Sequence, residues 1–185
     1  MHFCQDWRVV SHGLPYIINT LFDSIFTILG IVVGGAFGSV IDIRAIIGTI
    51  VIASISLGVS SGVSVYEAET IQEERRINKI EEAFLTDLEN TLITEESNLV
   101  TILSATLVFF TPLLTCVTTL VPFLLVNFGI IGINRSIIYA VILGLLLLFI
   151  TGLVFGGERR LLKGFRMTVL GGLVFLIGLL LNRMM

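Results

Sequence analysis

Long apolar segments alternate with short polar ones along most of this chain. A helix of about 20 apolar residues spans the hydrocarbon core of a bilayer, and five segments meet that requirement. We expect the spans at about 17–41, 45–66, 99–128, 136–155 and 165–182. Pro112 and Pro122 fall in the third span, where each removes a backbone hydrogen bond and favours a tilt or a kink. The pattern predicts an all-α integral membrane protein with five transmembrane helices and a single membrane domain, residues 1–185.

Polar residues are concentrated between the second and third predicted spans. Ten of the 14 acidic residues lie between Glu67 and Glu96. Apolar residues in this region recur at spacings of three and four, as on one face of an amphipathic helix: Ile77, Ile80, Phe84, Leu88 and Leu92. Acidic residues recur every seven positions on another face: Glu67, Glu74 and Glu81. The sequence therefore predicts an acidic amphipathic helix inserted as segment 67–97.

Composition narrows the class of protein. The chain is 55% hydrophobic with a mean hydropathy of +1.02, too apolar for a soluble domain. Its net charge of −3 comes from the acidic segment, and no basic patch is interleaved with aromatics, so no nucleic acid partner is expected. Cys4 and Cys116 are far apart, and Cys116 is expected to be a buried apolar residue. No motif of an activated nucleophile or a catalytic metal is present, so an enzyme is not expected.

Basic residues predict the orientation of the spans. With the N-terminus inside, the inner side holds eight of the 11 Lys and Arg residues, and the outer side holds Arg44, Arg135 and Arg183. This favours a cytoplasmic N-terminus, a cytoplasmic acidic helix and an external C-terminus. The N-terminal residues are too polar for a cleaved signal peptide, and no organelle-targeting segment is visible. The plasma membrane of a prokaryote is therefore the expected location.

Asp23 interrupts the first apolar segment. A carboxylate at the bilayer centre costs roughly 2.5–3.5 kcal/mol on insertion scales, so something must offset that cost. One interpretation makes Asp23 the cap of a helix that begins at Ser24 at the membrane surface. The apolar residues before it, Ile17, Ile18, Leu21 and Phe22, favour a deeper position. Asp23 is therefore our first candidate metal ligand.

Small and polar residues share a helix face with Asp23. At spacings of four, three, four and four this face carries Asp23, Thr27, Gly30, Gly34 and Gly38. The three glycines form a double GxxxG pattern, which lets another helix approach closely. Two first spans packed there would make a homodimer with two Asp23 carboxylates near the twofold axis. The glycines could instead pack helices within one chain. The second span has hydroxyls on one face, which suit either helix packing or an ion path: Thr49, Ser56, Ser60 and Ser64.

Three interpretations of the acidic helix stand. It could be a solvated face, which is the commonest role of a charge run. It could bind divalent cations, but only if oxygens converge from more than one element or subunit. It could also bind a protein partner through its apolar stripe, with the spans serving as an anchor that transports nothing. The candidate metal ligands in this segment are Glu67, Glu73, Glu74, Glu81 and Glu82.

The first two spans resemble those of the vacuolar iron transporter family. The similar stretches are FDSIFTILGIVVGGAFG at 22–38 and IASISLGVSSGVSVYEAE at 52–69, and FRMTVLGGLVFLIGLLLNR at 165–183 resembles the last span. The resemblance implies a homodimeric transporter of five helices that exports ferrous iron or manganese from the cytosol in exchange for protons. It also implies an ion path between the subunits, with Asp23 as the first-span aspartate and acidic helices that gather the metal.

The chain departs from the family pattern at potential metal ligands. Leu57 stands where the family has the methionine of SMG, and Thr49 stands where some members have a glutamate. Without the soft thioether the remaining donors are oxygens, which favours manganese or a broader divalent preference. A relative that keeps the fold and has lost transport is also compatible with these losses.

Overall fold

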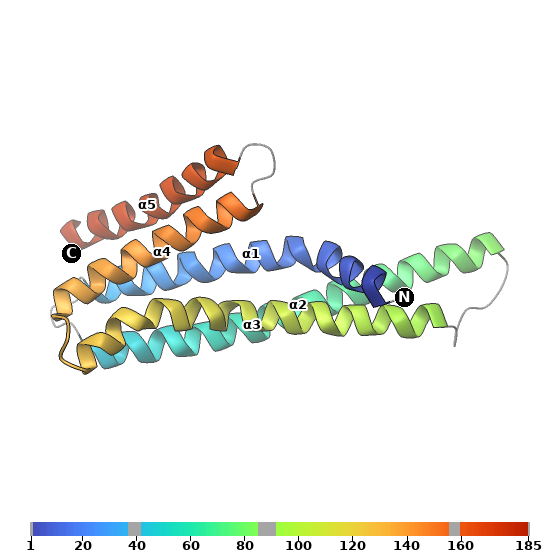
Figure 1. Ribbon diagram of the computed structural model, residues 1–185, viewed down its shortest axis with the longest axis horizontal. Helices are drawn as coiled ribbons and strands as arrows, with labels where there is room; N and C mark the ends of the chain where they lie inside the picture. The colour runs from blue at the N-terminus through green and yellow to red at the C-terminus, as the bar shows by residue number, and fades with distance from the viewer. Residues whose placement is uncertain (1, 37–41, 85–91, 156–159, 185) are drawn as a thin grey trace.

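The computed structural model describes residues 2–36, 42–84, 92–155 and 160–184. Within these ranges the chain forms helices and no strand. The helices are α1 (His2–Ala36), α2 (Ile43–Phe84), α3 (Leu92–Asn127), α4 (Ile133–Phe155) and α5 (Arg160–Met184) (Figure 1). The predicted all-helical fold is confirmed.

Four of these helices carry a stretch that is long and apolar enough to cross a membrane. The stretches within the described ranges are Leu14–Ala36, Ile43–Lys79, Leu99–Asn127 and Ile133–Phe155. The apolar part of α5 is shorter, Gly164–Gly178. The first four predicted spans therefore have matching helices, and the fifth span stays a prediction. Residues 37–41, in which we expected the first span to end, lie outside the described residues.

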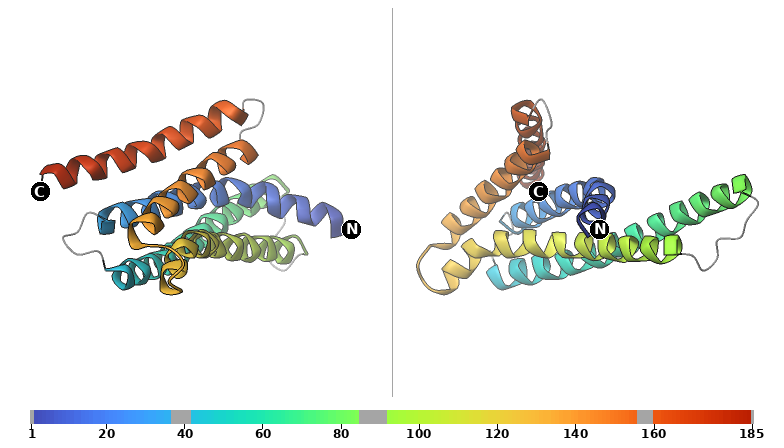
Figure 2. Two further views of the ribbon diagram at one scale, coloured as in Figure 1. Left: turned by 60° about the vertical axis from the view of Figure 1, so that its left-hand side comes forward. Right: turned by 45° about the vertical axis from the view of Figure 1, so that its right-hand side comes forward.

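Helix α1 lies between two helix pairs, α2–α3 on one side and α4–α5 on the other (Figures 1 and 2). One face of α1 supplies much of the apolar core, where four of its side chains are almost fully buried: Ile25, Ile28, Leu29 and Val32. A Cβ at Gly144 of α4 would come within 2.8 Å of the Leu29 side chain. Absence of a side chain at position 144 thus lets α4 pack directly on this face of α1.

The α2–α3 pair is held at close range by two glycines of α2. A Cβ at Gly58 would lie 2.7 Å from the backbone oxygen of Phe109, and one at Gly62 would lie 3.4 Å from that of Ala105. Both glycines are buried against α3. The two backbones therefore meet as in small-xxx-small helix pairs.

Helix α2 does not end at the membrane boundary that the sequence suggested. It continues without interruption through the first half of the acidic segment to Phe84, and α3 begins again at Leu92. The predicted acidic helix over 67–97 is therefore not confirmed as one element, because residues 67–84 are the end of α2 and residues from Leu92 onward belong to α3. No proline or glycine occurs between Val65 and Phe84, and the Glu, Arg, Lys, Gln and Ala residues there favour helix. Residues 85–91, which include Leu88, lie outside the described part of the chain.

The directions of α1, α2 and α3 place their polar ends at the same end of the bundle. The N-terminal end of α1, the acidic end of α2 and the beginning of α3 lie at one end of the bundle, and the C-terminal end of α5 lies at the other (Figure 1). Neighbouring α1 and α2 run antiparallel, whereas α1 and α3 run parallel. Ions gathered by the acidic end would thus approach the bundle from the side on which α1 begins.

The third helix runs through both of its prolines. Pro112 and Pro122 lie inside α3, and Pro112 is almost fully buried. Cys116 of the same helix is a buried free thiol among apolar neighbours, as expected. Threonine hydroxyls on α3 donate to the carbonyl one turn back, for example Thr115 to Thr111 at 3.2 Å and Thr119 to Thr115 at 2.9 Å. These buried hydroxyls are satisfied within their own helix.

Candidate functional site

Asp23 lies near the middle of the first membrane-spanning stretch. It is the tenth of the 23 residues from Leu14 to Ala36, about 13 Å along the axis at 1.5 Å per residue. Because α1 is helical from His2 onward, Ser24 does not begin a helix, and the interpretation of Asp23 as a helix cap is wrong. The structure therefore leaves the deeper position as the remaining prediction for Asp23.

The carboxylate of Asp23 is exposed on the surface of the single chain. Its Oδ2 accepts a long hydrogen bond of 3.4 Å from Nδ2 of Asn19, one turn earlier. Asn19 is also exposed. An exposed carboxylate at this depth would face hydrocarbon in an isolated chain, and ionisable groups inside membranes mark ion paths or helix contacts. Among the described residues, Asn19 is the hydrogen-bond partner of this carboxylate.

The exposed face of α1 is a stripe of polar and small residues. We call this face the α1 polar stripe, and its members, all without cover in the chain, are Asn19, Asp23, Thr27, Gly30 and Gly34. Cβ atoms at Gly30 and Gly34 would meet nothing within 4 Å. Packing by these two glycines within the chain, one of the two sequence interpretations, is therefore contradicted across the described ranges. Gly38, the third predicted interface glycine, lies outside the described residues.

A second polar row runs along α2. The four predicted hydroxyl residues are all exposed, and we call them the α2 hydroxyl row: Thr49, Ser56, Ser60 and Ser64. Thr49 donates to the carbonyl of Ala45 at 2.8 Å, which is the structural role we weighed for these residues. The row is nevertheless on the surface and not in a helix contact of the chain. Its oxygens are therefore available to whatever covers α2.

Two contacts between α1 and α2 define how the α1 polar stripe and the α2 hydroxyl row align along the axis of the bundle. Nε2 of Gln72 donates to the Tyr16 hydroxyl at 3.1 Å, and at the other end a Cβ at Gly35 would meet the side chain of Ile46. Asp23 lies seven residues after Tyr16 and 12 residues before Gly35. Because the two helices are antiparallel and rise equally per residue, these counts correspond to residues 65 and 58 of α2. Asp23 is therefore level with residues 58–65 of α2. That interval contains Ser60 and Ser64. Asp23 and these two serines thus lie within about 10 Å of one another along the axis of the bundle.

The acidic end of α2 presents its carboxylates to solvent. Glu67, Glu74 and Glu82 are exposed, as expected for a charged helix surface beyond the membrane. The side chain of Glu81 lies outside the described part of the structure. Three exposed basic residues lie between them, so this surface carries mixed charge with an acidic excess: Arg75, Arg76 and Lys79.

Glu73 differs from the other candidates because its carboxylate is mostly buried. Its Oε2 lies 3.7 Å from a guanidinium nitrogen of Arg76, and the side chain is 21% exposed. Its Oε1 is buried with no hydrogen-bond partner among the described residues. Part of the acidic surface is thus neutralised by a neighbouring cation, as is usual for helix pairs at this spacing.

The described residues of one chain do not assemble a complete metal site. They contain no group of three or more His, Cys, Asp or Glu side chains that could hold a metal ion. The predicted ligands are divided between mid-span Asp23 and the acidic end of α2. Within the described part of the chain, a site that encloses an ion would need oxygens in addition to these carboxylates.

Sequence reasoning missed two contacts that shape this region. Asn19 lies four residues before Asp23, the spacing at which helical side chains meet, so this pair could have been found. The contact between Tyr16 and Gln72 joins residues 56 positions apart, and no local pattern predicts it. The apolar stripe proposed for partner binding is described only in part, because the side chains of Ile80 and Phe84 lie outside the described residues.

Compared with protein-family models, curated proteins and solved structures, the chain matches none of them.

Proposed function

We propose that this chain is a transporter of divalent metal cations that works as a homodimer in the membrane. The observation that carries the proposal is the exposed carboxylate of Asp23 at mid-span, on a face of α1 that the chain leaves uncovered. An ionisable residue within a membrane segment marks a path for an ion or a proton. The resemblance of the first two spans to the vacuolar iron transporter family gives the same class of cargo, ferrous iron or manganese.

A second copy would cover the α1 polar stripe. Open space at Gly30 and Gly34 fits a closely packed helix, and a twofold axis along the stripe would bring two Asp23 carboxylates together. Two carboxylates and nearby hydroxyl oxygens are hard ligands, which suit manganese and similar divalent ions. The bound cation would offset the cost of both charges. Protonation of the same carboxylates would release it, which is how metal and protons would exchange.

The acidic end of α2 would serve as the cytoplasmic collector. Its exposed glutamates lie at the end of the bundle where α1 begins, and the same continuous helix carries the α2 hydroxyl row into the membrane. Basic residues favour the cytoplasm for this end. In this arrangement cations leave the cytoplasm along the α1 polar stripe. Export in exchange for protons is the direction that we propose.

Transport by the purified chain tests this function. Proteoliposomes that contain a manganese-sensitive dye and a pH-sensitive dye receive manganese outside. Uptake above that of protein-free liposomes is expected, and the lumen should become more alkaline as protons leave in exchange. Ferrous iron under reducing conditions provides a second cargo. Uptake equal to that of empty liposomes for both ions would contradict the proposal, and the chain would then be better described as a membrane anchor.

Neutralising the collector should change the apparent affinity more than the maximal rate. Replacing Glu67, Glu74 and Glu82 by Gln removes exposed charges beyond Tyr66, where the sequence predicts that the second span ends. We expect the KM for manganese to rise about three- to tenfold at low ionic strength, because focused fields change local ion concentrations by such factors. The difference should shrink at physiological salt, where the screening length is about 8 Å. An unchanged KM at low salt would remove the collector from the mechanism.

A further inference from the structure

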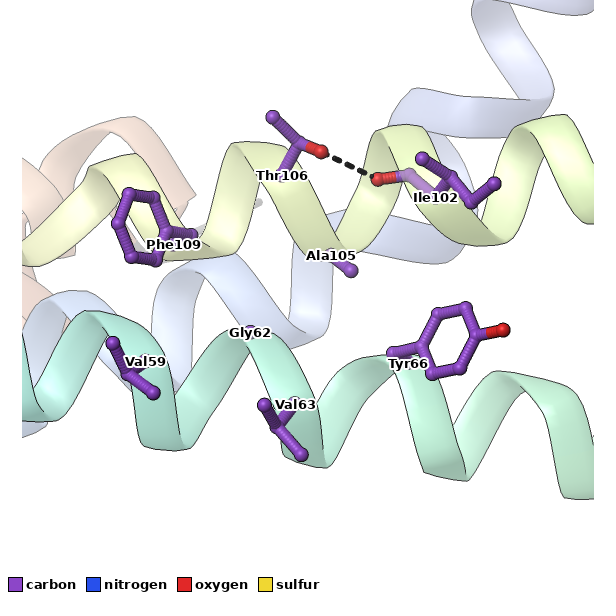
Figure 3. Close-up of a pocket in the computed structure, with 8 residues that line it drawn as sticks. All are labelled: Val59, Gly62, Val63, Tyr66, Ile102, Ala105, Thr106 and Phe109. Atoms are coloured by element: carbon purple, nitrogen blue, oxygen red, sulfur yellow. Dashed lines mark hydrogen bonds between the residues drawn. The ribbon is translucent and has the colours of Figure 1, made fainter.

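An open apolar groove of about 430 Å³ lies between α2 and α3 (Figure 3). It does not include the α1 polar stripe or the α2 hydroxyl row. Eight residues line it: Val59, Gly62, Val63, Tyr66, Ile102, Ala105, Thr106 and Phe109. Its size falls within the range of pockets that hold small molecules.

The groove exists because its floor is made of small residues. Gly62 and Ala105 bring the two backbones together, and the larger Val63 and Ile102 beside them stay half-exposed, at 57% and 53%. Larger side chains at the floor would have filled the hollow. The result is an open apolar groove along the helix pair.

The polarity of the groove changes along its length. Most of its lining is hydrocarbon, and the Thr106 hydroxyl is already used in a 2.7 Å hydrogen bond to the carbonyl of Ile102 (Figure 3). At one end stands the phenol of Tyr66, followed at once by the first acidic residue, Glu67. Tyrosines concentrate where hydrocarbon meets water, so this end lies at the interface. From there the lining becomes wholly apolar toward Val59, deeper in the span.

We propose that this groove binds one acyl chain of a zwitterionic phospholipid, with the headgroup at the Tyr66 end. Both walls belong to membrane-spanning stretches, so hydrocarbon is the medium that fills the groove. The gradient from phenol to aliphatic side chains matches the gradient from headgroup to acyl chain. Glu67 and Glu69, which follow Tyr66 on the same helix, would repel anionic headgroups and attract the amine of phosphatidylethanolamine. Apart from Glu67, which also belongs to the proposed collector, this inference uses none of the residues assigned to metal transport.

Lipid retention after purification tests the proposal. The full chain is reconstituted in an equal mixture of phosphatidylethanolamine and phosphatidylglycerol, extracted in mild detergent, and the retained phospholipid is measured by mass spectrometry. We expect about one phospholipid per chain, enriched in phosphatidylethanolamine. Thr106→Trp fills the groove from α3 and should lower the retained lipid about fivefold. Leu114→Trp, at a position on α3 that is 70% exposed and outside the groove, should retain as much as the wild type.

A second measurement covers the case in which Thr106→Trp fails to fold. Phosphatidylethanolamine with a photoreactive acyl chain, added to the wild-type protein, should label peptides that contain 59–66 and 102–109. Equal retention by wild type and Thr106→Trp when both fold, or labelling confined to other segments, would overturn the proposal. Preferential retention of phosphatidylglycerol would overturn the assignment of the headgroup. Efficient disulfide formation between two Val63→Cys chains would show that a second copy fills the groove, and would overturn it as well.

Discussion

Replacing Asp23 by Asn should abolish manganese transport and leave the folded protein intact. Asn has nearly the same shape and can still bond with Asn19, so the helix should be unaffected. Losing a charged oxygen ligand costs about 1.5–3 kcal/mol, which corresponds to roughly 10- to 100-fold weaker ion binding. Since two copies of the residue would face one ion in the dimer, the effect should lie toward the upper end. The initial rate of dye quenching after manganese is added to proteoliposomes that contain the manganese-sensitive dye measures it.

A matched control for this substitution is Asp42→Asn. Asp42 is also exposed, but it caps the start of α2, where its Oδ1 accepts hydrogen bonds from the backbone nitrogens of Arg44 at 2.9 Å and Ala45 at 3.3 Å. Asn caps helices about as well as Asp, so stability should be preserved. Asp42→Asn should transport like the wild type. Equal rates for Asp23→Asn and the wild type would exclude Asp23 from the ion path.

The second large effect concerns assembly. Replacing both Gly30 and Gly34 by Leu should convert the dimer to a monomer. Within the chain these positions are open, so the new side chains should not disturb the fold of the monomer. At a close helix contact, overpacking costs about 1–3 kcal/mol per position, so dimerisation should weaken by roughly tenfold or more for each subunit. The mass of the protein in detergent, or photobleaching steps of single labelled particles in liposomes, reports the change.

Gly172→Leu provides the control for assembly. Gly172 lies on α5, and a Cβ there also meets nothing within 4 Å. This variant should remain dimeric, which separates an effect of the α1 polar stripe from a general effect of added leucine in the membrane. A wild type that is monomeric at all accessible densities, or a dimer that survives both α1 substitutions, would show that another surface assembles the protein. Transport by a stable monomer would also refute the shared ion site.

Local patterns were sufficient to predict much of the candidate site. An acidic residue inside an apolar run located Asp23, and spacings of three and four identified its neighbours on the α1 polar stripe. Both depend on helical periodicity alone, which the sequence contains in full. The depth of Asp23 relative to Ser60 depends instead on how α1 and α2 align. That alignment is set by contacts such as Tyr16 with Gln72, between residues distant in the sequence.

The boundary of the second helix shows a different limit. Hydropathy ends the apolar stretch near Tyr66, but helix formation depends on backbone hydrogen bonds and intrinsic propensity and not on burial. The charged residues that follow are good helix formers, so α2 continues to Phe84. The change in hydropathy near Tyr66 therefore marks the end of the apolar stretch, but it does not mark the end of the helix.

Because α2 is one continuous helix, a tilt of its acidic end would also move its apolar part. The part beyond Tyr66 contains 18 residues up to Phe84 and projects about 27 Å at 1.5 Å per residue. A rigid rod that tilts by about 10° near Tyr66 would sweep its far tip through roughly 5 Å, with the opposite motion transmitted to the section that bears Ser60. Neutralising the glutamates at the far end of α2 would then be coupled to a movement of the segment that bears Ser60, because no break in the helix separates the two.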